Sequence, residues 1–194
     1  VLSSADVCEN SDVADQKTTL DYKLTVREIL DFATGVDYED IAFILESRTL
    51  NLALAEEGMK GSYGLKVGWA INLSDNREVF GGDFLCYAMS LTAAASDARM
   101  AGCTLAAMSN SGSGNQGMTT SLPVIEYAKE LNVSEETLYR ALVLSNLVTI
   151  HQKTSIGRLS AFCGAVSAGA GAGAGIGYLL GTDCDGIAHI VVNT

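Results

Sequence analysis

The chain has 194 residues, of which 48% are hydrophobic and 18% are charged, and its net charge is −11. This length and composition predict one globular domain, or one domain and a fragment, and exclude an intrinsically disordered chain. The acidic balance argues against nucleic acid and anionic membrane surfaces as partners.

The first part of the chain predicts two helices after an irregular lead-in. Residues 1–24 are polar and irregular, with one weak strand candidate at 18–24, and a helical domain is expected over 25–194. Thr25 and Glu28 have the spacing of a capping box for a short helix that ends at Gly35. A second helix is expected from Asp37 to about Glu57, and the next residue, Gly58, would follow its end.

Glycines and helix caps predict the next elements. Four glycines within residues 58–68 indicate a loop with unusual backbone angles or a close approach to another segment. Later helices are expected from Asp83 to about Ala101, from near Pro123 to about Leu131, and from Ser134 through Ile150.

Residues 159–182 contain no charged side chain, and small residues dominate them. In a helix, Gly169, Gly173 and Gly177 would share one face, with Gly171 and Gly175 on the opposite side. Glycine and alanine supply too little apolar surface for a membrane span, but they allow neighbouring helices to approach closely. We therefore predict a mainly α fold, a helical bundle around this central Ala/Gly-rich helix.

The five cysteines form no C-x-x-C pair, which disfavours a local zinc site and a disulfide framework. Reduced thiols and the absence of a secretory pattern at the start indicate a cytoplasmic protein. The chain starts with Val, and its final residues resemble an interrupted helix. We expect a fragment that is truncated at both ends.

Residues 109–117 read Ser-Asn-Ser-Gly-Ser-Gly-Asn-Gln-Gly, a run of uncharged polar and small residues. Such a loop can hold a carboxylate or phosphate, or it can simply connect two helices. Its G-x-G-x-x-G string lacks the preceding strand of a dinucleotide site. Its Ser-Gly-Asn also resembles the cofactor loop of pyridoxal phosphate dehydratases, with Lys60, Lys66 or Lys153 as Schiff-base candidates, but the α/β alternation of those enzymes is missing.

Several segments in order resemble the serine dehydratase α-chain family, in a branch that holds L-cysteine desulfidases and uncharacterised relatives. They are residues 63–68, 100–103, 108–117, 122–124, 140–142, 156–165 and the Ala-Gly run to 181. The resemblance implies a lyase that eliminates water from L-serine, or hydrogen sulfide from L-cysteine, to give pyruvate and ammonia. It also implies an oxygen-sensitive [4Fe-4S] cluster on three cysteines, with one iron left open as a Lewis acid.

The resemblance assigns only part of a cluster to this chain. Cys163, within Phe-Cys-Gly-Ala, matches the family's first cluster cysteine. The other two belong to a Cys-Asp-Gly-Ala-Lys…Cys segment that is expected beyond residue 194. Residues 184–186, Cys-Asp-Gly, follow the Ala-Gly run too soon, so we interpret them as coincidence. The family's Gly-Cys-Thr-Glu motif is also missing, and we expect the fragment alone to be inactive.

Within this resemblance, the polar loop is the natural place for the amino-acid substrate. Its carboxylate would accept hydrogen bonds from the loop, and Arg158 or Lys153 would add charge pairing. The loop candidates are Ser111, Ser113, Asn115 and Gln116. The alternative function is a non-catalytic helical domain that binds a small amino acid or mediates assembly, and a homo-oligomer is possible in either case.

Overall fold

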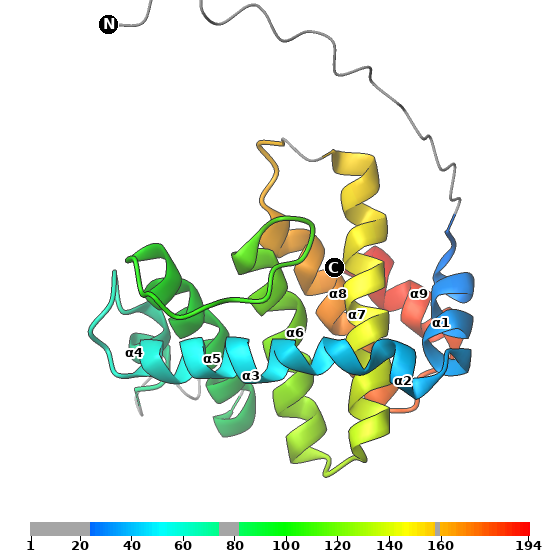
Figure 1. Cartoon of the computed structure of the whole chain (residues 1–194), viewed down its shortest axis with the longest axis horizontal. Helices are drawn as coiled ribbons and strands as arrows, with labels where there is room; N and C mark the ends of the chain where they lie inside the picture. The colour runs from blue at the N-terminus through cyan, green and yellow to red at the C-terminus, as the bar shows by residue number, and fades with distance from the viewer. Residues whose placement is uncertain (1–23, 74–81, 158–159) are drawn as a thin grey trace, which may run out of the picture.

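A computed structural model describes residues 24–73, 82–157 and 160–194, and among these residues the regular elements are helices (Figure 1). No strand occurs in that part of the chain, which confirms the mainly α prediction; an isolated bridge joins Asn110 to Ser113. The predicted lead-in lies outside the described residues, apart from its last one. The elements are α1 (Val26–Gly35), α2 (Tyr38–Ile41), a 3-10 helix η1 (Ala42–Leu45), α3 (Glu46–Met59), α4 (Val67–Ile71), α5 (Asp83–Met100), α6 (Gly114–Glu130), α7 (Glu135–Ile156), α8 (Gly164–Leu179) and α9 (Cys184–Asn193).

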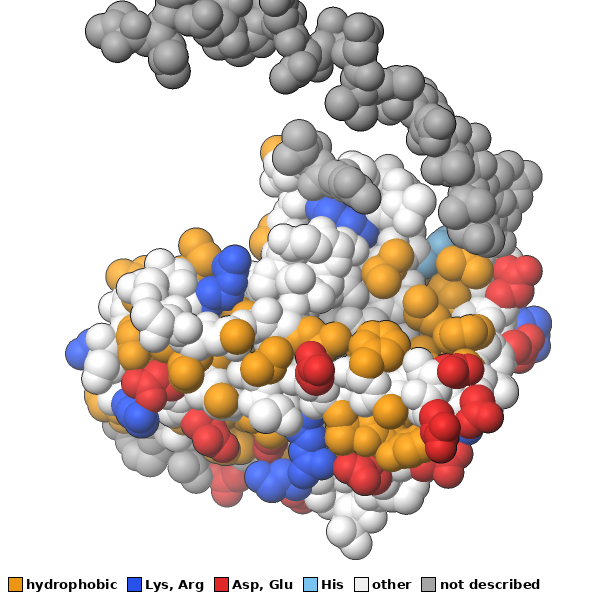
Figure 2. Space-filling model, viewed as in Figure 1, with side chains coloured by type: hydrophobic (Ala, Val, Ile, Leu, Met, Phe, Trp, Pro, Cys, Tyr) orange, Lys and Arg blue, Asp and Glu red, His pale blue; other side chains and the backbone are white. Residues whose placement is uncertain are grey.

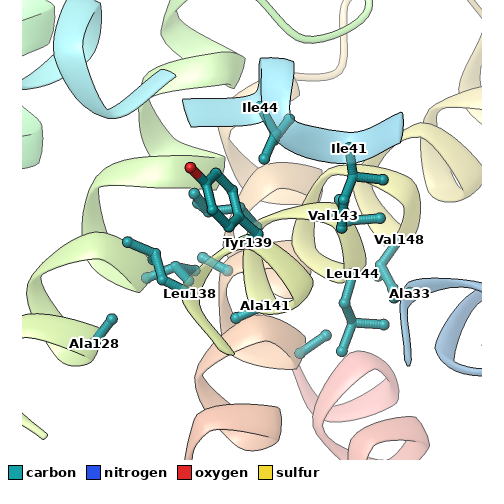
Figure 3. Close-up of a cluster of buried hydrophobic side chains, with 14 of the residues drawn as sticks. Ala33, Ile41, Ile44, Ala128, Leu138, Tyr139, Ala141, Val143, Leu144 and Val148 are labelled. Carbon is teal, nitrogen blue, oxygen red and sulfur yellow. The ribbon is translucent and has the colours of Figure 1, made fainter. Parts of the chain in front are cut away.

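Helix α7 lies at the centre of the larger hydrophobic core. Its apolar side chains pack against α1, α2 and η1 on one side and against α6 and α8 on the other (Figure 3). Tyr139 also meets Tyr38 edge to face, with ring centroids 4.7 Å apart. A second, smaller core joins α3, α5 and α6 through residues such as Leu54, Leu91 and Met118. Helix α6 therefore belongs to both cores and connects them.

The Ala/Gly-rich helix is confirmed as α8, and its glycines allow close packing on two opposite faces. A Cβ atom on Gly171 would lie 2.0 Å from Thr149 Oγ1 of α7, and one on Gly175 would lie 2.9 Å from Val124 Cγ2 of α6. On the other face, Cβ atoms on Gly173 and Gly177 would lie 2.9 and 2.7 Å from Ile190 of α9. A larger side chain at Gly171 would push α8 away from the backbone of α7, whereas one at Gly173 or Gly177 would displace the Ile190 side chain of α9.

Helix boundaries near the N-terminal half are partly as predicted. The Thr25–Glu28 capping box is present, and Asp37 caps α2. The prediction that Gly58 follows the helix end is wrong, because Gly58 lies inside α3 and a Cβ there would lie 2.0 Å from the Ala94 carbonyl oxygen of α5. The helix expected from Asp83 is present as α5, and Asp83 is its first helical residue, with Gly82 as the N-cap.

The predicted start of a helix near Pro123 is wrong, because Pro123 lies inside α6. Proline cannot donate the backbone hydrogen bond of its turn, so a carbonyl one turn earlier loses its partner. Nearby hydroxyl groups bind carbonyls in this stretch: Ser145 of α7 donates to the Thr120 oxygen at 2.8 Å, and Ser121 donates to the Gly117 oxygen at 2.9 Å. Because α6 begins at Gly114, residues 114–117 of the polar loop form the first turn of this helix. Helix α7 also runs beyond the predicted end, to Ile156.

Candidate functional site

The polar loop makes a tight reversal immediately before α6. Asn110 and Ser113 exchange backbone hydrogen bonds of 3.1 and 3.0 Å. Between them, Ser111 and Gly112 have φ angles of 49° and 81°. Two successive positive φ angles are typical of a type I′ turn, which glycine enters without steric cost. The turn holds Ser111 and Gly112 at the exposed tip.

Ser113 is the N-cap of α6, where its hydroxyl oxygen accepts a hydrogen bond from the Gln116 backbone N–H at 3.3 Å. This hydroxyl is therefore already used by the helix start and is not a free donor for a ligand. The sequence held a signal for this role, because Ser113 and Gln116 have the S-x-x-Q spacing of a capping box. The structure contains the Ser113 half of that motif alone, because the Gln116 side-chain amide donates to Asn110 instead of binding back to the helix start.

A buried chain of amide groups ties the loop to α7. Gln116 Nε2 donates to Asn110 Oδ1 at 2.7 Å, and Asn110 Nδ2 donates to Asn146 Oδ1 at 2.8 Å. Ser111 Oγ adds a third bond, to Asn110 Oδ1 at 3.0 Å. Gln116 is fully buried, so its hydrogen bond to Asn110 forms away from competing water. The network fixes the orientation of the loop on the bundle.

The Gln116 side chain also reaches the beginning of α8. A Cβ atom on Gly164 would lie 2.3 Å from Gln116 Oε1, so glycine is required for this contact. Cys163 precedes Gly164 as the exposed N-cap of α8, and its side chain makes no capping hydrogen bond. The fold thus brings two predicted site residues, Gln116 and Cys163, to one junction between helix ends.

Two buried oxygen atoms near this junction lack hydrogen-bond partners among the described residues. They are Gln116 Oε1 and Oγ of Ser167, which lies in the first turn of α8 after Gly164. Buried oxygen atoms normally have partners, and each one left unpaired costs roughly 1–3 kcal/mol. The junction therefore has unused capacity to accept hydrogen bonds from a water or a ligand.

Asn115 faces a cation that the sequence analysis did not identify. Arg99, at the end of α5, donates from Nη1 to Asn115 Oδ1 at 3.1 Å. A Cβ on Gly114 would lie 2.3 Å from Arg99 Nε, so the guanidinium lies directly over the first residue of α6. The sequence offered one signal for Arg99, because this residue directly precedes residues 100–103, one of the segments on which the family resemblance rests.

The loop separates two cavities. One, of about 560 Å³, lies on the Arg99 side and is lined by Arg99, Met100, Cys103, Leu105, Ala107, Ser109, Gly112 and Gly114. The other, of about 640 Å³, is lined by Ser111, Gly112, Ile150, Lys153, Thr154 and Gly157. Lys153 therefore lies near the loop tip, whereas Arg158 lies outside the described residues.

The described residues do not by themselves form a metal centre. Within 24–73, 82–157 and 160–194, no three His, Cys, Asp or Glu side chains gather closely enough to hold a metal ion. Cys184 begins α9 after its cap Asp183, whose carboxylate accepts from the Gly186 N–H at 2.8 Å. The residues 184–186 thus have a local role as a helix start. Nor does any helix in this part of the chain have the length and apolar character needed to cross a membrane.

Comparisons with known proteins agree with the resemblance found in the sequence. The family described as serine dehydratase alpha chain matches residues 4–194. A UPF0597 protein from Desulfitobacterium hafniense is 54% identical over 88% of this chain and 39% of its own length. Similar UPF0597 proteins from Lachnoclostridium phytofermentans and Clostridium perfringens are 52% and 48% identical, over 91% and 96% of this chain and 42% and 44% of their own lengths.

The chain thus spans about two-fifths of the length of these curated relatives. No solved structure matches it. A family match over nearly the whole chain, together with relatives of this identity, leaves one assignment: the chain belongs to the serine dehydratase α-chain family.

Proposed function

We propose that this chain is part of an iron–sulfur-dependent amino-acid lyase that eliminates water from L-serine or hydrogen sulfide from L-cysteine. Family membership supports the reaction class. The observation that carries the proposal is the junction of Gln116 with Gly164, which joins the polar loop to Cys163. A substrate site and a cluster ligand need to be adjacent for this chemistry, and these two segments are adjacent.

Cys163 is the residue of this chain that we assign to the cluster. Its exposed position at the start of α8 leaves the thiol accessible to a bound group. Because the described residues do not complete a ligand set, we propose that the other ligands come from the part of the relatives that this chain does not span. The cluster would supply Lewis acidity at its open iron.

The residues of this chain would bind and orient the amino acid. Gln116 Oε1 is a buried acceptor without a partner among the described residues, and we propose that it accepts a hydrogen bond from the substrate ammonium group. Asn110 holds the Gln116 amide so that Oε1 faces α8. This arrangement favours ligands with a free amino group over hydroxy acids of the same size.

The test is anaerobic reconstitution of the full-length protein with iron and sulfide. We expect visible cluster absorption and release of pyruvate from L-serine or L-cysteine. Cys163→Ser should lose most of both, whereas the matched variant Cys184→Ser should retain them because Cys184 begins a different helix. A full-length protein that stays colourless and inactive after careful reconstitution would overturn the proposal.

The same protein distinguishes the two alternatives. Calorimetric binding of L-serine without turnover would support a non-catalytic amino-acid-binding domain. A pyridoxal enzyme would give an internal aldimine absorption band on addition of the cofactor, and mutation of its lysine would remove the band. Lys153 is the lysine to mutate first, because it lines a cavity with Ser111 and Gly112 next to the loop.

A further inference from the structure

Arg99 has an unusual electrostatic position. Its guanidinium lies over Gly114, the first residue of the 17-residue helix α6. The N-terminal end of a helix carries partial positive charge, so an exposed cation such as Arg99 is mildly unfavourable there unless an anion compensates. Within the described residues, however, Arg99 makes no ion pair, and its recorded partners are the neutral atoms Asn115 Oδ1 and Met100 Sδ.

The surroundings are built to keep the cation in place. Glycine at 114 leaves the room that Arg99 occupies, and Asn115 orients Nη1 through the 3.1 Å hydrogen bond. The chain has 23 acidic residues, yet the surface around the loop before α6 is mainly uncharged in the face that Figure 2 shows. The red side chains on this face lie mostly in its lower half and at its right side. The cavity of about 560 Å³ beside Arg99 has no carboxylate in its lining.

Cys103 lines the same cavity and brings a reactive atom to it. It is half-buried and lies beside Tyr63, whose hydroxyl donates to Glu57 Oε1 at 2.9 Å. The Glu57 carboxylate and the Cys103 sulfur raise the pKa of Tyr63 to about 12, so Tyr63 remains a neutral donor at physiological pH. The Cys103 thiol is thus in a defined polar setting, in a cavity that also presents a cation.

We propose that the Arg99 cavity is a carboxylate-binding site in which Arg99 pairs with the substrate carboxylate, next to the Cys103 thiol. The assignment rests on the proposed function, which it deepens by choosing the Arg99 side of the loop over the Lys153 side. Guanidinium groups bind carboxylates through paired N–H donors, and the exposed backbone at Gly112 and Gly114 adds room for close approach. The ligand is a small carboxylate such as a free amino acid.

The test uses Cys103 as a reporter in the full-length protein kept under reducing, anaerobic conditions. Iodoacetate and iodoacetamide react with a thiol in the same way: sulfur bonds to the methylene carbon, the carbon–iodine bond breaks, iodide leaves, and the thiol proton passes to solvent. Only iodoacetate carries a carboxylate. The measured quantity is the ratio of the two alkylation rates at Cys103, from peptide mass spectrometry, with Cys184 as the internal reference.

We expect the iodoacetate-to-iodoacetamide ratio at Cys103 to exceed that at Cys184 by roughly three- to tenfold, as one charge-assisted contact would give. Arg99→Gln should remove this preference, and the matched change Lys153→Gln, on the other side of the loop, should leave it intact. Equal ratios at Cys103 and Cys184, or a preference that persists in Arg99→Gln, would overturn the assignment.

A second measurement needs no variant, so it holds even if Arg99→Gln folds poorly. L-Serine should slow carboxymethylation of Cys103, whereas L-serinamide, which lacks the carboxylate, should not. Equal protection by both compounds would contradict a carboxylate site. Labelling requires neither a cluster nor turnover. If labelling depends on Arg99 but the protein is inactive, the proposed lyase function is contradicted and the carboxylate site stands. If the protein is active but labelling does not depend on Arg99, the carboxylate site is contradicted and the lyase function stands.

Discussion

Gln116 of α6 and Gly164 of α8 meet at the junction of the two helices. The Gln116 Oε1 atom lies 2.3 Å from the position that a Cβ atom on residue 164 would occupy. This contact connects the polar loop to Cys163 although the two segments are far apart in the sequence. A larger residue at 164 would displace the same side-chain amide of Gln116 that donates to Asn110.

Gly164→Ala should therefore impair substrate binding more than it impairs folding. The added methyl group would displace the end of a flexible side chain, so the loss of stability should be modest, about 1 kcal/mol. The Gln116 oxygen would move away from α8, and calorimetry should show weaker binding of L-serine. The control is Gly35→Ala, where nothing lies within 4 Å of the added Cβ. Unchanged binding in Gly164→Ala would contradict a role for this contact.

Gly171→Ala should be strongly destabilising. The new methyl group would lie 2.0 Å from Thr149 Oγ1 and 2.5 Å from the Ser145 carbonyl oxygen, and the backbone of α7 cannot move aside locally. Overpacking of this kind costs about 2 kcal/mol or more. Urea unfolding monitored by circular dichroism measures the change.

The matched control for this prediction is Gly169→Ala, two residues earlier in the same helix. Its Cβ would meet only Thr194 Cγ2, at 3.8 Å, which is ordinary van der Waals distance. The better helix propensity of alanine should stabilise this variant by up to about 1 kcal/mol. If both variants lose the same stability, close packing on the α7 side does not explain the glycine pattern of α8.

The helical bundle and its Ala/Gly-rich helix follow from sequence patterns, because small residues at helical spacing allow neighbouring helices to approach closely. The start of α6 was predictable in principle, since Ser113 and Gln116 carry a capping signal, but Pro123 gave a stronger and misleading one. Pro123 lies inside α6, where Ser145 of α7 donates a hydrogen bond to the Thr120 carbonyl oxygen nearby. A contact from a helix that follows later in the chain is invisible to local rules.

The candidate site shows the same limit. The local sequence proposed the loop and the family resemblance proposed Cys163, but neither could show that the hydroxyl of Ser113 is used by a cap or that Gln116 is fully buried. It missed Arg99, because a lone arginine at a helix end is usually a surface charge. Only the approach of α5 to Gly114 reveals its position over the start of α6.

Arg140→Met should loosen α1 from α7. The Arg140 guanidinium donates to the Ala33 and Thr34 carbonyl oxygens at 2.9 and 2.8 Å, at the C-terminal end of α1, and pairs with Glu136 at 2.8 Å. Methionine keeps the aliphatic volume but none of these hydrogen bonds, so we expect a loss of about 2 kcal/mol in urea unfolding.

The comparison for this variant is Arg27→Met, which removes an exposed ion pair with Asp185 whose two side chains are 65% and 84% accessible. Exposed pairs contribute little, so its cost should stay below about 0.5 kcal/mol. If both variants lost the same free energy of unfolding, the hydrogen bonds from Arg140 to the α1 carbonyl oxygens would contribute no more stability than an exposed ion pair.

Glu126→Gln should stabilise the protein at neutral pH and leave it unchanged in acid. Burial raises the pKa of Glu126, and the pairing with Lys129, at 3.8 Å, opposes that shift only in part. The folded pKa therefore lies above the unfolded one. The favourable contribution of the protonated acid is complete below the unfolded pKa, near 4.3, and is lost as the pH rises through the folded pKa. At pH 7 the buried carboxylate is charged, and the neutral amide avoids that cost. We expect the variant to melt about 2 °C higher at pH 7 and at the same temperature near pH 4.

Glu130→Gln, an exposed position on the same helix, should show no such pH dependence. A lower melting temperature for Glu126→Gln at pH 7 would mean that the Lys129 pair outweighs the burial.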